Sequence, residues 1–173
     1  TKRPILLELE GVGVADTRFT YAVGTLVLWS LEPDRVRGAE SLVKLGKGKL
    51  AIANPKTAPY GRASKQVLER LGLWKKLQSI LVQGENIAQT LQFVATGNAM
   101  FGFVAKSQVI DPRFKFKGSS WEVPADQHEP ILQQAILLKQ GIANASAKQF
   151  LRYLQGNESK KIIQSYGYRS LKE

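Results

Sequence analysis

The sequence of 173 residues contains no cysteine, one histidine and one methionine. Without cysteine the chain forms no disulfide and offers no thiolate to a metal. His128 alone does not build a transition-metal site, and no nucleophile with a neighbouring base appears along the chain. We therefore expect no catalytic residues, no metal and no cofactor. An enzyme ranks last among the functions considered, and His128 is expected at the surface.

Long apolar runs are also missing. The longest apolar candidate, residues 21–29, has the length of a strand and falls short of the roughly 18–20 residues that span a bilayer. The first ten residues hold only a short apolar stretch interrupted by acids, so we expect any export signal to lie upstream of Thr1. The hydrophobic fraction of 43% is ordinary for a globular protein and excludes disorder as a class.

Acidic residues are scarce relative to basic ones. The net charge of +11, from 25 basic and 14 acidic residues, favours an anionic partner such as nucleic acid, a membrane surface or a small anion. The basic residues are dispersed and their longest runs are pairs, and no helix-turn-helix, zinc-finger or RNA-recognition signature is present. A nucleic-acid-binding module is therefore the less favoured alternative.

Strand-like and helix-like segments alternate along the chain, which predicts an α/β fold with mainly parallel strand pairing. The segment 113–121 is expected to be irregular and basic. The expected strands are residues 19–29, 49–53, 79–83, 100–104 and 133–139, and the expected helices are residues 4–10, 39–45, 60–71, 87–95, 105–109, 144–154 and 158–166.

Three strand-to-helix junctions, at residues 58–62, 84–87 and 104–107, are candidates for binding chemistry. The carboxyl ends of parallel strands meet at one edge of a sheet, and each following helix starts with amides that lack an intrahelical acceptor. Together with the helix dipole, such amides form an anion site. They would hold a tetrahedral oxyanion without a full positive charge, which eases release. The alternative is that these junctions are structural only, since every α/β protein contains them. Arg62, Lys65 and Lys106 either attract anions or are solvated surface cations.

At these junctions the sequence resembles the periplasmic molybdate-binding proteins of ABC transporters. Four long segments carry the resemblance, and three short motifs follow in the family's order, so that it covers nearly the whole chain. The long segments are FTYAVGTLVLWS at 19–30, AIANPKTAPYGRA at 51–63, GENIAQT at 84–90 and GNAMFGFVA at 97–105, and the short motifs are WEVP at 121–124, PI at 130–131 and YGY at 166–168.

The resemblance implies a type II periplasmic-binding-protein fold, in which two α/β lobes close on the ligand and two strands cross between them. This chain is expected to hold one complete α/β lobe plus the C-terminal part of the other lobe, and to lack most of the N-terminal lobe. Residues 1–30 would be the remnant of the first lobe with the hinge strand. Residues 31–124 would form the second lobe, and residues 125–173 the return hinge strand and the C-terminal helices of the first lobe.

The resemblance also implies a ligand, molybdate or tungstate, that is carried to a transporter permease in the periplasm. A receptor for sulfate, thiosulfate or phosphate is the alternative within this class. Ala105 stands where some family members have a tyrosine hydroxyl, and alanine cannot supply that donor. Because the first-lobe loops have no counterpart, weak binding and self-association through the exposed remnant are expected. The implied ligands are the backbone amides of Tyr60 and Ile87, with Pro59, Gly61, Asn86 and Ala105 as supporting residues.

Overall fold

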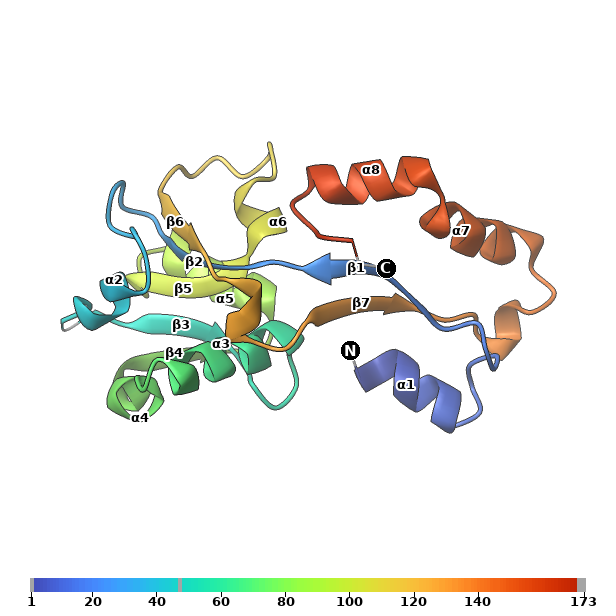
Figure 1. Cartoon of the computed structure of the whole chain (residues 1–173), viewed down its shortest axis with the longest axis horizontal. Helices are drawn as coiled ribbons and strands as arrows, with labels where there is room; N and C mark the ends of the chain where they lie inside the picture. The colour runs from blue at the N-terminus through green and yellow to red at the C-terminus, as the bar shows by residue number, and fades with distance from the viewer. Residues whose placement is uncertain (1, 47, 171–173) are drawn as a thin grey trace. The chain divides into compact units, whose positions relative to one another are not determined.

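The computed structural model describes residues 2–46 and 48–170 (Figure 1). The chain divides into two compact units: unit 1 comprises residues 1–24 and 131–173, and unit 2 comprises residues 25–130. These divisions differ from the bounds at 30/31 and 124/125 that the sequence suggested. Residues 25–30 fall in unit 2 because the chain pairs inside the sheet of that unit directly after Thr25. Residues 125–130 follow another strand of the same sheet and belong to the same unit.

Unit 2 is built on a five-stranded sheet of order β4-β3-β5-β2-β6. Strand β3 (Leu50–Ala53) runs parallel to β4 (Leu81–Gly84) and β5 (Phe101–Ala105), whereas β2 (Leu26–Ser30) runs antiparallel to β5 and β6 (Ser119–Glu122). The prediction of mainly parallel pairing is therefore wrong for the β2–β6 side. A strand buried on both faces is apolar throughout, whether its neighbours run parallel or antiparallel to it. Its composition therefore does not indicate the direction of pairing.

Two helices cover the sheet of unit 2. Helix α5 (Ile87–Ala95) contributes Val94 to a core cluster with Val27, Trp29 and Val104. Side chains alternate between the faces of a strand, so Leu26 and Leu28 point to the opposite face. Helix α3 (Pro59–Arg70) packs on β3, β5 and β2 through its own apolar stripe. That stripe consists of the buried residues Ala63, Val67 and Leu68.

The remaining elements of unit 2 are short. They are α2 (Glu40–Val43), α4 (Trp74–Leu77), α6 (Lys106–Val109) and the 3-10 turns Gln78–Ile80 and Ala125–Gln127. Strand β6 occupies part of the segment that was expected to be irregular, and its Trp121 pairs with Leu28. Its residues alternate between half-buried and exposed, and serine and glutamate dominate it, so the sequence carried little strand signal there.

Unit 1 contains the antiparallel pair β1 (Phe19–Gly24) and β7 (Ile131–Ala135), with helices α1 (Lys2–Leu9), α7 (Ala145–Gln155) and α8 (Asn157–Ser165) and the turn Lys139–Gly141. The single strand expected at 19–29 is thus two strands, β1 and β2, that end and begin on either side of Thr25 and pair in different sheets. None of the described helices has the length and apolar character needed to cross a bilayer.

Apolar surface remains exposed mainly in unit 1. Its buried hydrophobic residues are few, with Ala22, Ile131 and Leu137 among them. Among the described residues, the large exposed hydrophobic side chains of unit 2 are only Val43, Ile110 and Phe116. Those of unit 1 are Ile5, Leu6, Leu9, Val12, Leu138, Ile142, Phe150, Tyr153, Ile162 and Tyr166.

We predict that the chain self-associates through unit 1, because many exposed large hydrophobic side chains and a two-stranded sheet favour pairing with another copy. Light scattering should give a mass above 19.2 kDa that rises with protein concentration. Leu9→Lys should reduce this mass, because Leu9 is 78% exposed in unit 1. Val43→Lys is the matched control, since Val43 is 73% exposed in unit 2. A single-chain mass at every concentration would contradict the prediction.

Candidate functional site

The ends of three parallel strands define one edge of the unit 2 sheet. In the register of β3 and β4, Ala53 lies opposite Gly84, and in that of β3 and β5, Ala51 lies opposite Gly102. The Asn54 N–H donates to the Gly84 carbonyl over 2.7 Å, one residue beyond the strand pair. The loops that lead into α3 and α5 therefore start from the ends of two neighbouring strands, β3 and β4, at one edge of the sheet, as the strand-to-helix pattern predicted (Figure 1).

Asn54 shapes the loop that leads into α3. Its carbonyl accepts the Ala58 N–H over 2.8 Å, and its side-chain oxygen accepts the Lys56 N–H over 3.0 Å. Pro59 then starts the helix, where its missing N–H has no cost. The first helical bond at this end joins the Arg62 N–H to the Ala58 carbonyl over 3.1 Å. The Tyr60 amide thus lies in the first turn, where N–H groups point out of the helix start.

Gly61 lets the start of α3 lie directly against the end of β3. A Cβ atom at this position would collide with the Ala53 carbonyl oxygen and would lie 2.6 Å from the carbonyl carbon. These are backbone atoms of a buried strand and do not move aside as a flexible side chain does. The glycine is therefore required by the close approach that places the Tyr60 amide at the edge of the sheet.

Side chains cap the start of α5 and bind one amide of the helix and one amide of the loop before it. The Asn86 side-chain oxygen accepts the Gln89 N–H over 2.9 Å, and the Gln89 side chain in turn accepts the Glu85 N–H over 2.7 Å. The Asn86 carbonyl accepts both the backbone N–H and the hydroxyl of Thr90. Within the described residues, the amides of Ile87 and Ala88 have no hydrogen-bond acceptor. These two donors are what α5 offers to a ligand.

The third junction contributes differently. Ala105 ends β5 and is buried, and its N–H donates to the Gln108 side-chain oxygen over 3.0 Å. Ala105 therefore offers neither a hydroxyl nor its amide at this edge. The Gln108 side-chain nitrogen donates to the Ile87 carbonyl over 3.1 Å, which ties α6 to the first residue of α5. Gln108 contacts two of the three junctions, and the sequence did not single it out. Its position three residues after the helix N-cap, where a capping glutamine stands, was the available signal.

Two of the three cations considered as anion attractors form ion pairs. Lys106 lies 2.6 Å from the Glu122 carboxylate, and Lys65 lies 3.5 Å from Glu69 and 5.4 Å above the Trp74 ring. Both pairs involve partly exposed side chains, so they contribute little stability and little directed field. The backbone amides remain the candidate directional donors at this edge.

His128 is buried, and the expectation that it lies at the surface is wrong. Its exposed fraction is 7%, and its Nδ1 lies 2.7 Å from the Glu129 carbonyl oxygen. A carbonyl can only accept, so Nδ1 carries the proton. The turn that precedes His128 packs on α3, and the Glu129 N–H donates to the Gln66 side chain. The sequence offered no second histidine or cysteine for a metal site and therefore favoured a surface histidine, but the structure buries the ring in unit 2.

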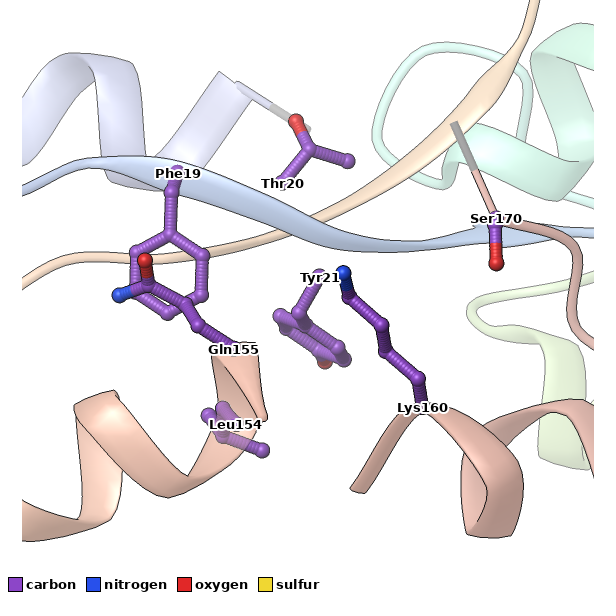
Figure 2. A pocket seen from close by; sticks show the side chains of 7 residues that line it. All are labelled: Phe19, Thr20, Tyr21, Leu154, Gln155, Lys160 and Ser170. Carbon is purple, nitrogen blue, oxygen red and sulfur yellow. The ribbon is translucent and has the colours of Figure 1, made fainter. Parts of the chain in front are cut away.

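Unit 1 holds a separate cavity of about 580 Å³ between β1 and the α7–α8 region (Figure 2). Figure 2 shows the Lys160 side chain extending toward Tyr21. Burial, and secondarily the nearby Tyr168, raise the pKa of the Tyr21 hydroxyl above its ordinary value. The predicted oxyanion ligands do not line this cavity. Its lining residues are Phe19, Thr20, Tyr21, Leu154, Gln155, Lys160 and Ser170.

Comparison with known proteins identifies the class of the fold. The periplasmic molybdate-binding protein of Azotobacter vinelandii has a solved structure with a TM-score of 0.91 at 40% identity, covering 99% of this chain and 75% of that one. The substrate-binding domain of a molybdenum transporter from Clostridium difficile gives a TM-score of 0.76 at 29% identity and covers 99% of this chain and 74% of that one. The fold is that of the type II periplasmic binding proteins.

Sequence comparison identifies the family. Residues 1–169 match the bacterial extracellular solute-binding proteins, and the chain belongs to this family. The molybdate-binding protein ModA of Azotobacter vinelandii is 51% identical over 95% of this chain, and that of Rhodobacter capsulatus is 48% identical over 96%. The chain spans 66% and 65% of the length of these two relatives. The relatives are binding proteins, not enzymes.

We predict that Gly61→Ala lowers the free energy of unfolding of unit 2 by about 2 kcal/mol or more, because the added methyl group overpacks the end of β3. Urea unfolding followed by tryptophan fluorescence measures this directly, since Trp29, Trp74 and Trp121 all lie in unit 2. Gly38→Ala is the control: its methyl group meets the carboxylate end of the exposed Glu40 side chain, which can rotate away. A Gly61 variant as stable as the Gly38 variant would show that the approach of α3 to β3 is not tight.

Proposed function

We propose that this chain binds a tetrahedral oxyanion, molybdate or tungstate, for delivery to the permease of an ABC transporter. The observation that carries the proposal is the pairing of two helix starts at neighbouring strand ends, held together by the bond from Asn54 to Gly84. The relatives named as molybdate-binding proteins, at 51% and 48% identity, support molybdate as the ligand. We therefore favour molybdate or tungstate over sulfate, thiosulfate or phosphate.

The proposed ligands are the backbone amides of Tyr60 and Ile87. A peptide unit is planar and trans, so an N–H points away from the carbonyl of the preceding residue. The Asn86 carbonyl points into α5 toward Thr90, and the Ile87 N–H consequently points out of the helix start. Helix dipoles favour a negative charge at such positions. Gly61 and Asn86 support the site by placing α3 and by capping α5.

The setting of the protein follows from its family. Membership of the extracellular solute-binding proteins supports export, and we propose that the chain works in the periplasm with a permease as partner. No chemical transformation and no cofactor form part of this proposal, because the ligand is released unchanged. The net charge of +11 then assists capture of a dianion and does not indicate a nucleic-acid partner.

We expect this chain to bind molybdate more weakly than micromolar. The family resemblance places the other half of the oxyanion donors in the part of the relatives that this chain does not match. A charge-assisted hydrogen bond contributes about 1.5–3 kcal/mol, so the loss of two or three costs several orders of magnitude in affinity. Isothermal calorimetry should therefore show no tight site, and a micromolar dissociation constant would contradict this expectation.

Nuclear magnetic resonance detects binding at this strength and also locates it. In ¹H–¹⁵N spectra of the labelled chain, molybdate should shift the amide signals of Tyr60, Gly61, Ile87 and Ala88 together along one titration curve. Sodium sulfate at equal ionic strength, titrated in parallel, measures selectivity. Shifts confined to signals around surface lysines, or no shift at these four amides, would refute the proposed function.

A charge variant tests the position of the anion. Asn86→Asp keeps an N-cap side chain but adds a negative charge at the start of α5. Two like unit charges 4 Å apart repel by about 1 kcal/mol in water, and a dianion doubles this, so the dissociation constant should rise about 30-fold. Asn144→Asp is the matched control, because Asn144 caps α7 in unit 1 through the same bond. Equal effects of the two variants would indicate only a general loss of positive field.

A further inference from the structure

Gln108 joins two of the three strand-end junctions through its side chain. Its oxygen accepts the Ala105 N–H over 3.0 Å, and its nitrogen donates to the Ile87 carbonyl over 3.1 Å. An N–H must face an acceptor and a carbonyl must face a donor, so only this orientation of the side-chain amide satisfies both partners. One half-buried side chain thus connects the end of β5 with the first residue of α5.

Of the two backbone groups that Gln108 contacts, the Ile87 carbonyl is the one that belongs to the start of α5. Inside α5 the Ile87 carbonyl already faces the Leu91 amide, and a carbonyl oxygen has two lone pairs, so Gln108 adds a second donor to it. This carbonyl belongs to the same rigid peptide plane as the Ala88 N–H. On the preceding peptide, the two bonds from Thr90 hold the Asn86 carbonyl and with it the Ile87 N–H. The two amides that α5 turns outward are therefore fixed by separate restraints, and Gln108 supplies one of them.

We propose that Gln108 is a positioning residue for oxyanion binding, which orients the Ile87–Ala88 peptide of α5, and with it the Ala88 N–H, toward the anion from behind. This inference rests on the proposed function, because it names the anion as the group that the oriented amides contact. Gln108 itself directs both ends of its amide to the backbone: the oxygen accepts one hydrogen bond, and the nitrogen uses one of its two N–H groups. Ala105 contributes through Gln108, because the Ala105 amide holds the Gln108 side chain at the end of β5. We call the two hydrogen bonds of the Gln108 side chain, to Ala105 and to Ile87, the Gln108 clamp.

The test is Gln108→Met in the full chain, compared with Gln92→Met. Methionine keeps the length of the side chain and removes both hydrogen bonds. Gln92 is exposed on α5, and within the described residues its side chain makes no hydrogen bond, so its variant controls for the same change of residue type on that helix. In ligand-free spectra, Gln108→Met should shift the Ile87 and Ala88 amides and speed hydrogen exchange at Ala105, whereas Gln92→Met should leave these signals in place.

The same samples are then titrated with molybdate. We expect Gln108→Met to raise the dissociation constant about tenfold, equivalent to about 1.4 kcal/mol, and Gln92→Met to leave it within about twofold. If the ligand-free signals change but the affinity of the Gln108 variant matches that of the control, Gln108 is a structural clamp only and the inference is wrong. If the parent chain shows no molybdate response at Tyr60 or Ile87, the proposed function itself fails. The ligand-free comparison would still show whether the clamp exists.

Discussion

The parallel pairing of β3 with β4 is the constraint on which the candidate site depends. Register places Ala53 beside Gly84, and the Asn54 amide extends the ladder by one more bond to the Gly84 carbonyl. Two helices that leave the sheet from neighbouring strand ends start near each other whatever their side chains are. If this ladder slipped by one residue, the Asn54 N–H would lose the Gly84 carbonyl, and the starts of α3 and α5 would shift relative to each other.

A site made of backbone amides places unusual demands on the residues around it. Its specificity resides in where the peptide planes point, so the important side chains are those that hold peptides and not those that touch a ligand. Asn54 shapes the loop before α3, Asn86 and Thr90 hold the first turn of α5, and Gln108 joins that turn to β5. Such a site is preformed at little entropic cost to the ligand. It also carries no fixed positive charge that would oppose release.

Much of the fold could be predicted from the sequence where local signals were strong. Helix α5 has the predicted bounds, and the helix predicted at 144–154 is present as α7 with Asn144 as its cap, because capping residues and the apolar period agree in these segments. The direction of β2, the presence of β6 and the burial of His128 could not be predicted, since each depends on contacts with residues far away in the sequence. For the site, the helix starts at Tyr60 and Ile87 were recognisable from motif order. The capping position of Gln108 in α6 was a signal in the sequence, but its bond to α5 was not predictable, because it forms only once α6 and α5 lie side by side.

The central claim is that the Tyr60 and Ile87 amides share one dianion. Its most direct measurement is a crystal of this chain soaked in tungstate, with diffraction data collected at the tungsten absorption edge, where anomalous scattering locates the heavy atom independently of any assumed site. We predict one dominant peak at the edge of the β4-β3-β5 strand ends, with tungstate oxygens about 2.7–3.2 Å from both amide nitrogens. A dominant peak bound by lysine or arginine side chains elsewhere, with none at this edge, would contradict the account.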